Sequence, residues 1–173
     1  VSGAMIFSIV KRKRWKHIRI PYTKHKRRIH ATDPYFENLR MKSIALLNNS
    51  DATILSVFQL VQEIPHEYFD KNGMEFDGVY TGFLKRLFKE LSLQEYRQVK
   101  IIIDARKHPG GISGAEHFQR DINNFLKNEF SETHCSFLPT PSYIDILVEL
   151  ADFVSNTFYR AYRQDEKAIF KQL

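Results

Sequence analysis

The sequence predicts a mixed α/β fold whose later strands are parallel and flanked by helices. Two observations support this class. From residue 52 onward, short apolar runs alternate with amphipathic runs of helical period, and such alternation favours parallel strands with helices covering both faces of the sheet. The 173 residues are 43% hydrophobic, enough for one core and too few for two. We therefore expect one domain over residues 1–163, with a basic insertion at 11–30 and a C-terminal tail at 164–173.

The first part of the chain predicts a strand, a basic connection and a helix. Residues 2–10, "SGAMIFSIV", form an apolar run typical of a strand. Residues 11–30, "KRKRWKHIRIPYTKHKRRIH", are predicted to be a long connection. Pro21 argues against a continuous central strand there, because proline has no N–H to donate to a neighbouring strand. A helix is predicted over residues 32–50, where "TDP" supplies a capping side chain and a proline for the first turn.

Three pairs of strand and helix are predicted in the rest of the chain. The apolar and amphipathic periods differ clearly along this region. The predicted strands are 52–64, 99–104 and 134–138, and the predicted helices are 79–91, 113–130 and 142–163. Residues 70–78, "DKNGMEFDG", are predicted to be a turn and not a calcium loop, because Met74 stands where an oxygen ligand belongs.

Positive charge is concentrated in one segment. Residues 11–30 hold ten of the 26 Lys and Arg and no acid, which leaves 16 basic against 20 acidic residues elsewhere. Cations displace counterions from phosphates and flat rings stack on bases, so this mixture favours nucleic acid as partner; a solvated charged loop is the alternative. The predicted contacts are Lys11, Arg12, Lys13, Arg14, Trp15, Lys26, Arg27, Arg28, Arg106 and Lys107.

Carboxylates stand at two places that we expect to meet at one edge of the sheet. Asp104 ends the strand at 99–104, where ligands of open α/β sheets gather. Asp145, Glu149 and Asp152 recur at helical spacing and so share one stripe of the last helix. Oxygen ligands without His or Cys suit Mg²⁺ or Mn²⁺, and two such ions promote phosphodiester cleavage. All four are predicted metal ligands, with Asp104, Glu149 and Asp152 catalytic; a loop cap and a solvated seam are the alternatives.

The chain resembles a known family, and the motifs that carry the resemblance lie in its second half. "VKIIID", a helix, a short strand and "PSYIDILVELADFVSNTFYRAYR" are similar to the mostly microbial family catalogued as domain of unknown function 3800, which is regarded as ribonuclease H-like. A typical member has a mid-chain strand ending in Asp, similar to Asp104, and a last helix with a Gln-Leu-Ala-Asp-like motif, similar to "ELAD" at residues 149–152. The resemblance spans residues 1–163. It implies a ribonuclease H-like sheet and a metal-dependent nuclease acting on RNA, DNA or hybrid.

The opening motif of that family is absent from the sequence. A typical member begins with a strand ending in Asp-Glu-Ser-Gly, whereas "VSGAMIF" resembles the second strand. We expect either a truncated chain or a member that has lost the first acid, and therefore weak metal binding and low activity. A non-catalytic module that binds nucleic acid or regulates another protein is the alternative function.

Other features of the sequence bear on where in the cell the protein is expected to act. "AMIFSIV" is too short to span a bilayer, and its basic cluster follows it, so we expect neither a membrane segment nor a signal peptide. The single cysteine, Cys135, cannot form an internal disulfide, which favours a reducing, cytoplasmic compartment. No paired zinc spacing, phosphate-binding loop or Ser-His-Asp arrangement is recognisable. The sequence predicts no particular oligomeric state.

Overall fold

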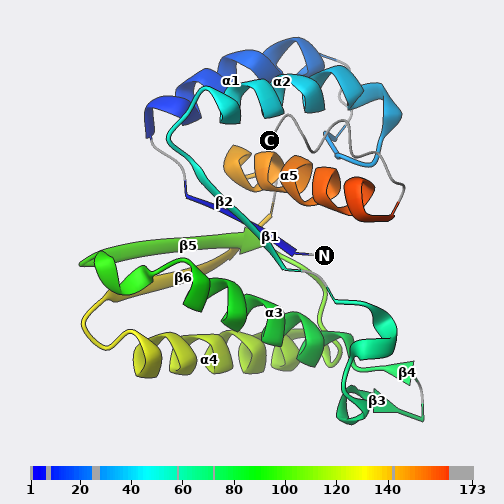
Figure 1. The fold of residues 1–173 in the computed structure, drawn as a ribbon, viewed down its shortest axis with the longest axis vertical. Coiled ribbons are helices and arrows are strands. Elements are labelled where there is room, and N and C mark those ends of the chain that lie inside the picture. The colour runs from blue at the N-terminus through cyan, green and yellow to red at the C-terminus, as the bar shows by residue number, and fades with distance from the viewer. Residues whose placement is uncertain are drawn as a thin grey trace. The chain divides into compact units, whose positions relative to one another are not determined.

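The chain is mixed α/β, as predicted, with more helix than strand. The computed structural model describes residues 2–6, 9–24, 28–57, 59–71, 73–141 and 143–163. The chain divides into two compact units, which are described separately (Figure 1). Unit 1 comprises Gly3–Ser56 and the chain from Pro141 onward, and unit 2 comprises Val57–Thr140. The expected single domain and ribonuclease H-like sheet stay predictions.

Unit 1 is built mainly of helices. Its core contains Trp15, Phe36, Leu39, Leu150 and Phe153, all with 0% of their surface exposed. These side chains come from three helices and a 3₁₀ turn, so burial of one shared apolar core joins elements far apart in the sequence. The elements are β1 (Ser2–Ile6) paired with β2 (Thr53–Val57), α1 (Ile9–Thr23), the 3₁₀ turn η1 (Pro34–Phe36), α2 (Glu37–Asn48) and α5 (Ile146–Arg163).

The basic segment is largely helical, which corrects its prediction as a long connection. Lys and Arg are good helix formers, and Trp15, Ile18 and Tyr22 recur at helical spacing and pack against the core. Pro21 lies in the last turn of α1, where its missing N–H removes only one hydrogen bond. The argument from Pro21 therefore excluded a strand but did not exclude a helix.

The helix predicted over residues 32–50 is confirmed, with the predicted cap. The Asp33 carboxylate accepts a hydrogen bond from the Tyr35 N–H at 3.0 Å, and Pro34 opens the 3₁₀ turn that leads into α2. The strand predicted over 52–64 is shorter, because β2 ends at Val57 and residues 61–63 form a 3₁₀ turn. The length of an apolar run does not by itself separate strand from helix.

Unit 2 contains the parallel strand pair. β5 and β6 run parallel, in register from Gln98 opposite His134 to Asp104 opposite Thr140, and α4 makes the crossover. The short pair β3 and β4 is antiparallel and occupies part of the predicted turn. The elements are the 3₁₀ turns η2 (Val61–Glu63), η3 (His66–Tyr68) and η4 (Leu93–Glu95), the strands β3 (Phe69–Asp70), β4 (Gly73–Met74), β5 (Gln98–Asp104) and β6 (His134–Thr140), and the helices α3 (Phe76–Glu90) and α4 (Gly111–Glu129).

An aromatic core joins the helices of unit 2 to its strands. Phe118 of α4 packs with its ring centroid 5.9 Å from that of Phe137 of β6, and Phe88 of α3 lies 6.5 Å from Phe137. Figure 1 shows α3 and α4 on the same side of the β5–β6 pair. Both helices begin near the carboxyl end of β5, because each runs antiparallel to the strand it covers. Among the described residues, no helix is long and apolar enough to cross a membrane.

Candidate nucleic-acid interface and charged sites

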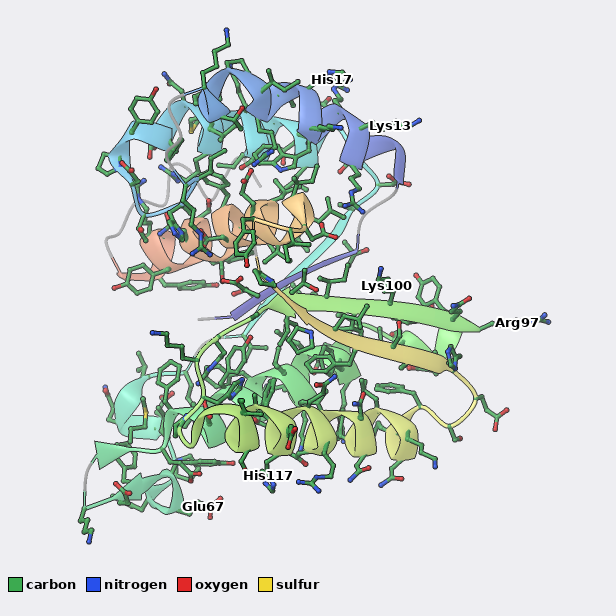
Figure 2. The ribbon with its side chains drawn as sticks, turned by 180° about the vertical axis from the view of Figure 1, so that it is seen from behind. Lys13, His17, Glu67, Arg97, Lys100 and His117 are labelled. Carbon is green, nitrogen blue, oxygen red and sulfur yellow. The ribbon has the colours of Figure 1, made fainter. Side chains whose placement is uncertain are left out.

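The α1 helix presents cations on the side opposite its buried stripe. At 100° per residue, Lys13 lies about 160° around the helix from the buried Trp15. Figure 2 shows Lys13 and His17 extending outward from α1. We define the outer face of α1 as Lys13, Arg14, Lys16 and His17, all of which are exposed. Within the described part of the chain, none of the four takes part in an ion pair.

The opposite side of α1 is held on α5 by directed polar contacts. Arg19 donates from Nε and Nη2 to the two carboxylate oxygens of Glu149, at 2.8 and 2.7 Å. Only 4% of the Glu149 side chain is exposed. The Trp15 indole N–H donates to the Ile146 carbonyl oxygen at 2.9 Å. This two-point pairing and the indole contact fix the rotation of α1 about its axis, so the outer face keeps its direction.

Asp145 and Asp152 also make polar contacts within unit 1. Asp145 accepts a hydrogen bond from the Leu147 N–H at 2.9 Å and so caps the start of α5. Its second oxygen lies 3.4 Å from the Arg12 guanidinium. Asp152 accepts a hydrogen bond from the Ala31 N–H at 3.0 Å. Asp145 and Glu149 therefore hold the basic segment in place, and Asp152 holds the residue that follows it.

Glu149 and Asp152 lie on α5 and Asp145 caps its start, and Glu149 does not fit a metal site in this arrangement. Crowded carboxylates need positive partners, and arginines supply the charge that we had assigned to Mg²⁺ or Mn²⁺. Both oxygens of Glu149 are already occupied by Arg19. Among the described residues, no group of three or more His, Cys, Asp or Glu is placed to bind a metal ion. Asp104 lies in unit 2, and its predicted approach to Glu149 and Asp152 stays a prediction.

One predicted nucleic-acid contact is wrong. Trp15 is fully buried and its N–H is bonded to the backbone of α5, so its ring cannot stack on a base. The helical spacing of Trp15, Ile18 and Tyr22 was the signal that would have placed it in the core. Lys26 and Arg27 lie outside the described residues, as does the Lys11 side chain.

The carboxyl edge of β5 carries Asp104, as its topology predicted. Asp104 is exposed, and its negative charge acts on the Tyr80 hydroxyl. Burial, and secondly the negative charge of Asp104, raise the pKa of Tyr80 to about 12. The Arg106 guanidinium stacks over the Tyr80 ring, 4.5 Å from its centroid, whereas Lys107 is exposed. Arg106 thus packs within unit 2, and only Lys107 of this pair points its charge to solvent.

Sequence reasoning missed a charged cluster beside this edge. Asp77, in the first turn of α3, forms an ion pair with Arg106 and contacts Nδ1 of His108 at 3.0 Å. The His108 side chain is 4% exposed and packs 4.7 Å from the Phe118 ring. Burial, and secondly the Arg106 charge, lower the pKa of His108, so the neutral ring dominates at neutral pH. Asp77 thereby anchors the loop that follows Asp104.

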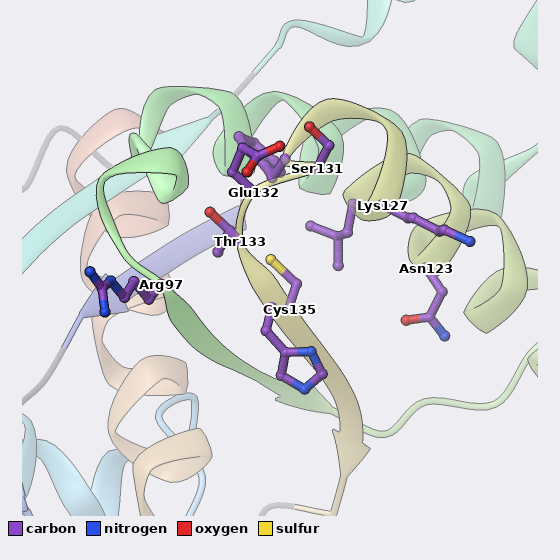
Figure 3. Close-up of a pocket in the computed structure, with 10 residues that line it drawn as sticks. Arg97, Asn123, Lys127, Ser131, Glu132, Thr133 and Cys135 are labelled. Atoms are coloured by element: carbon purple, nitrogen blue, oxygen red, sulfur yellow. The ribbon is translucent and has the colours of Figure 1, made fainter.

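A half-open pocket lies at the other end of the strand pair (Figure 3). Its volume is about 560 Å³, and its lining includes Arg97, Lys127, His134 and Cys135. Burial raises the pKa of the Cys135 thiol, which therefore stays protonated and weakly nucleophilic. The pocket borders the amino end of β6, whereas ligands of open α/β sheets bind beyond the carboxyl ends. Neither its position nor its thiol indicates catalysis.

Comparisons of the chain with protein-family models, curated proteins and solved structures found no match. The resemblance to the family of domain of unknown function 3800 therefore stays a prediction. Any functional inference has to come from the charges and contacts of the chain itself.

Proposed function

We propose that unit 1 is a nucleic-acid-binding module whose outer face of α1 contacts backbone phosphates. The supporting observation is the sorting of cations around α1. Arg12 and Arg19 turn toward the acids of α5, whereas the outer face, defined above, points to solvent and contains no acid. A polyanion binds where positive charge is concentrated and not already neutralised.

The α5 acids do not cancel this charge. Glu149 is buried and paired with Arg19, and Asp145 is 11% exposed beside Arg12. An ordinary solvated helix mixes both signs on its surface, whereas residues 11–30 contain ten cations and no acid. A solvated face with no partner would gain nothing from such one-sided charge, because like charges repel along the helix.

The test is the salt dependence of binding. Fluorescence anisotropy of a labelled DNA duplex of about 15 base pairs is measured between about 50 and 300 mM KCl. The logarithm of the association constant should fall linearly with the logarithm of salt concentration, with a slope of roughly −3, since about three cations each release about 0.9 counterion. Sequence should have little effect, because phosphates carry no base information. Absence of binding at low salt, or binding that ignores salt, would refute the proposal.

Metal-dependent phosphodiester cleavage is our second proposal. Its support is the position of Asp104, which is exposed at the carboxyl end of a parallel strand. Against it stands Glu149, which Arg19 already binds. RNA, single-stranded DNA and hybrid are incubated with Mg²⁺ or Mn²⁺ and with wild type or Asp104→Asn, which keeps the shape of Asp104 and removes its charge. Equal cleavage by both proteins, or none by either, would end the proposal.

A further inference from the structure

An exposed aromatic side chain lies beside the start of α5. Tyr143 is 73% exposed and the next residue, Ile144, is 61% exposed. Their backbone is nonetheless held in a turn, because the Ile144 N–H donates to the Pro141 carbonyl oxygen at 2.8 Å. The Asp145 cap of α5 follows at once. The ring is therefore presented from an anchored turn, and a ligand that covers it recovers the free energy lost by its exposure to water.

The basic segment reaches this ring through Arg28. The Arg28 guanidinium lies over the Tyr143 ring, 6.0 Å from its centroid. Arg12 of α1 lies 3.4 Å from Asp145, two residues after Tyr143. Arg12 itself remains 45% exposed. Arg28 thus adjoins an exposed ring within unit 1, and Arg12 lies beside the cap of the helix that follows the ring.

We infer that Tyr143 is a base-stacking contact and that the ligand of unit 1 is single-stranded nucleic acid. This inference rests on the proposed phosphate contacts of the outer face of α1. A base whose two faces are not already stacked can lie against the Tyr143 ring, while Arg28 holds the adjoining phosphate. The bases of a duplex are stacked on one another and cannot reach the ring without unpairing.

Tyr143, the proposed stacking residue, lies outside the basic segment. The tryptophan of the basic segment, Trp15, is 0% exposed and packs in the core. Among the large hydrophobic residues described in unit 1, Tyr143 is the most exposed. Cations on α1 supply affinity that depends on salt, and Tyr143 adds a contribution that depends on exposed bases.

The experiment compares one single strand with one duplex on the full chain. Labelled oligo-dT of about 15 nucleotides and a duplex of equal length are titrated with wild type, Tyr143→Ala and Tyr143→Phe. Tyr162→Ala is the matched control, because Tyr162 is also exposed, at 52%, near the end of α5. Tyr143→Ala should lose about tenfold in affinity for the single strand, with no change for the duplex. Tyr143→Phe and Tyr162→Ala should behave as wild type.

The outcomes separate this inference from the proposed function. If single strand and duplex both bind with the expected salt dependence, but Tyr143→Ala binds oligo-dT as wild type does, the stacking inference is wrong and the phosphate contacts stand. If Tyr143→Ala weakens both ligands equally, the preference for single strands is wrong. If wild type binds neither ligand, the proposed function fails, and the inference fails with it. Fluorescence of the buried Trp15 confirms that each variant is folded.

Discussion

A buried carboxylate needs positive groups to replace the water that it loses on folding. Glu149 is 4% exposed, and the positive group that replaces its water is the Arg19 guanidinium, which donates to both carboxylate oxygens. Arg suits the role because its planar guanidinium matches a carboxylate with two parallel hydrogen bonds. Removal of one partner leaves the other charge buried and unpaired, which costs more than the pair contributes.

The first prediction concerns Arg19. Arg19→Ala should lower the free energy of unfolding by roughly 2–4 kcal/mol, less than for a fully buried pair because Arg19 is 21% exposed. Arg14→Ala on the outer face of α1 is the control and should change it by no more than about 0.5 kcal/mol. Urea unfolding followed by Trp15 fluorescence measures both. Equal effects would show that the Arg19–Glu149 pair does not hold α1 on α5.

The second prediction concerns Tyr80, whose pKa is raised to about 12 by burial and by Asp104. Tyr80→Phe should leave the tyrosinate absorbance rise below about pH 11 unchanged, because Tyr80 keeps its proton there. The folded chain holds this proton more tightly than the unfolded chain does. The contribution of Tyr80 to stability is therefore present below about pH 10 and is lost as pH rises toward 12. A smaller absorbance rise in Tyr80→Phe below that pH would contradict the assignment.

At the scale of elements, the periodicity of apolar residues predicted the positions of most strands and helices. The strands β5 and β6 and the helices α3, α4 and α5 all occur near their predicted positions, because their apolar spacings are regular. The α1 helix was missed because charge dominated the interpretation of residues 11–30 and Pro21 was treated as an argument about strands. The apolar stripe of α1 stabilises a helix because α5 buries Trp15.

The third prediction concerns the start of α4. A Cβ added at Gly114 would stand 1.9 Å from the Pro109 carbonyl oxygen, so the backbone would have to shift. Gly114→Ala should therefore destabilise the protein by roughly 1–3 kcal/mol, although Ala usually favours a helix over Gly. Ser113→Ala, the exposed neighbour, is the control and should be nearly neutral. Urea unfolding followed by far-ultraviolet circular dichroism decides, and a neutral Gly114→Ala would contradict the close approach.

At the scale of the whole molecule, the sequence predicted where charges lie better than it predicted their partners. The position of Asp104 followed from topology, since a parallel strand carries its carboxyl end to a known edge. The α5 stripe was also identified, but spacing along one helix does not show that Glu149 pairs with a residue 130 positions away. Asp77 and His108 were missed for the same reason, because they lie 31 residues apart in the sequence.

The net charge of the chain is +6, although the segments outside residues 11–30 carry more acid than base. Binding through overall charge and binding through one helix face therefore make different predictions for variants of equal net charge. Overall charge would make any three lysines or arginines equivalent. A local phosphate contact depends on which three are changed.

The most direct test of the central claim replaces three cations on the outer face of α1, in Lys13→Gln/Arg14→Gln/Lys16→Gln. The matched control, Lys71→Gln/Lys100→Gln/Lys127→Gln, removes three exposed cations from unit 2 and gives the same net charge. Anisotropy titrations with the labelled DNA duplex over a range of KCl measure the salt slope of each protein. The α1 variant should have a slope smaller in magnitude by about 3, with the control unchanged, because each lost phosphate contact removes about 0.9 counterion. Equal slopes for the two variants would contradict the assignment of phosphate binding to α1.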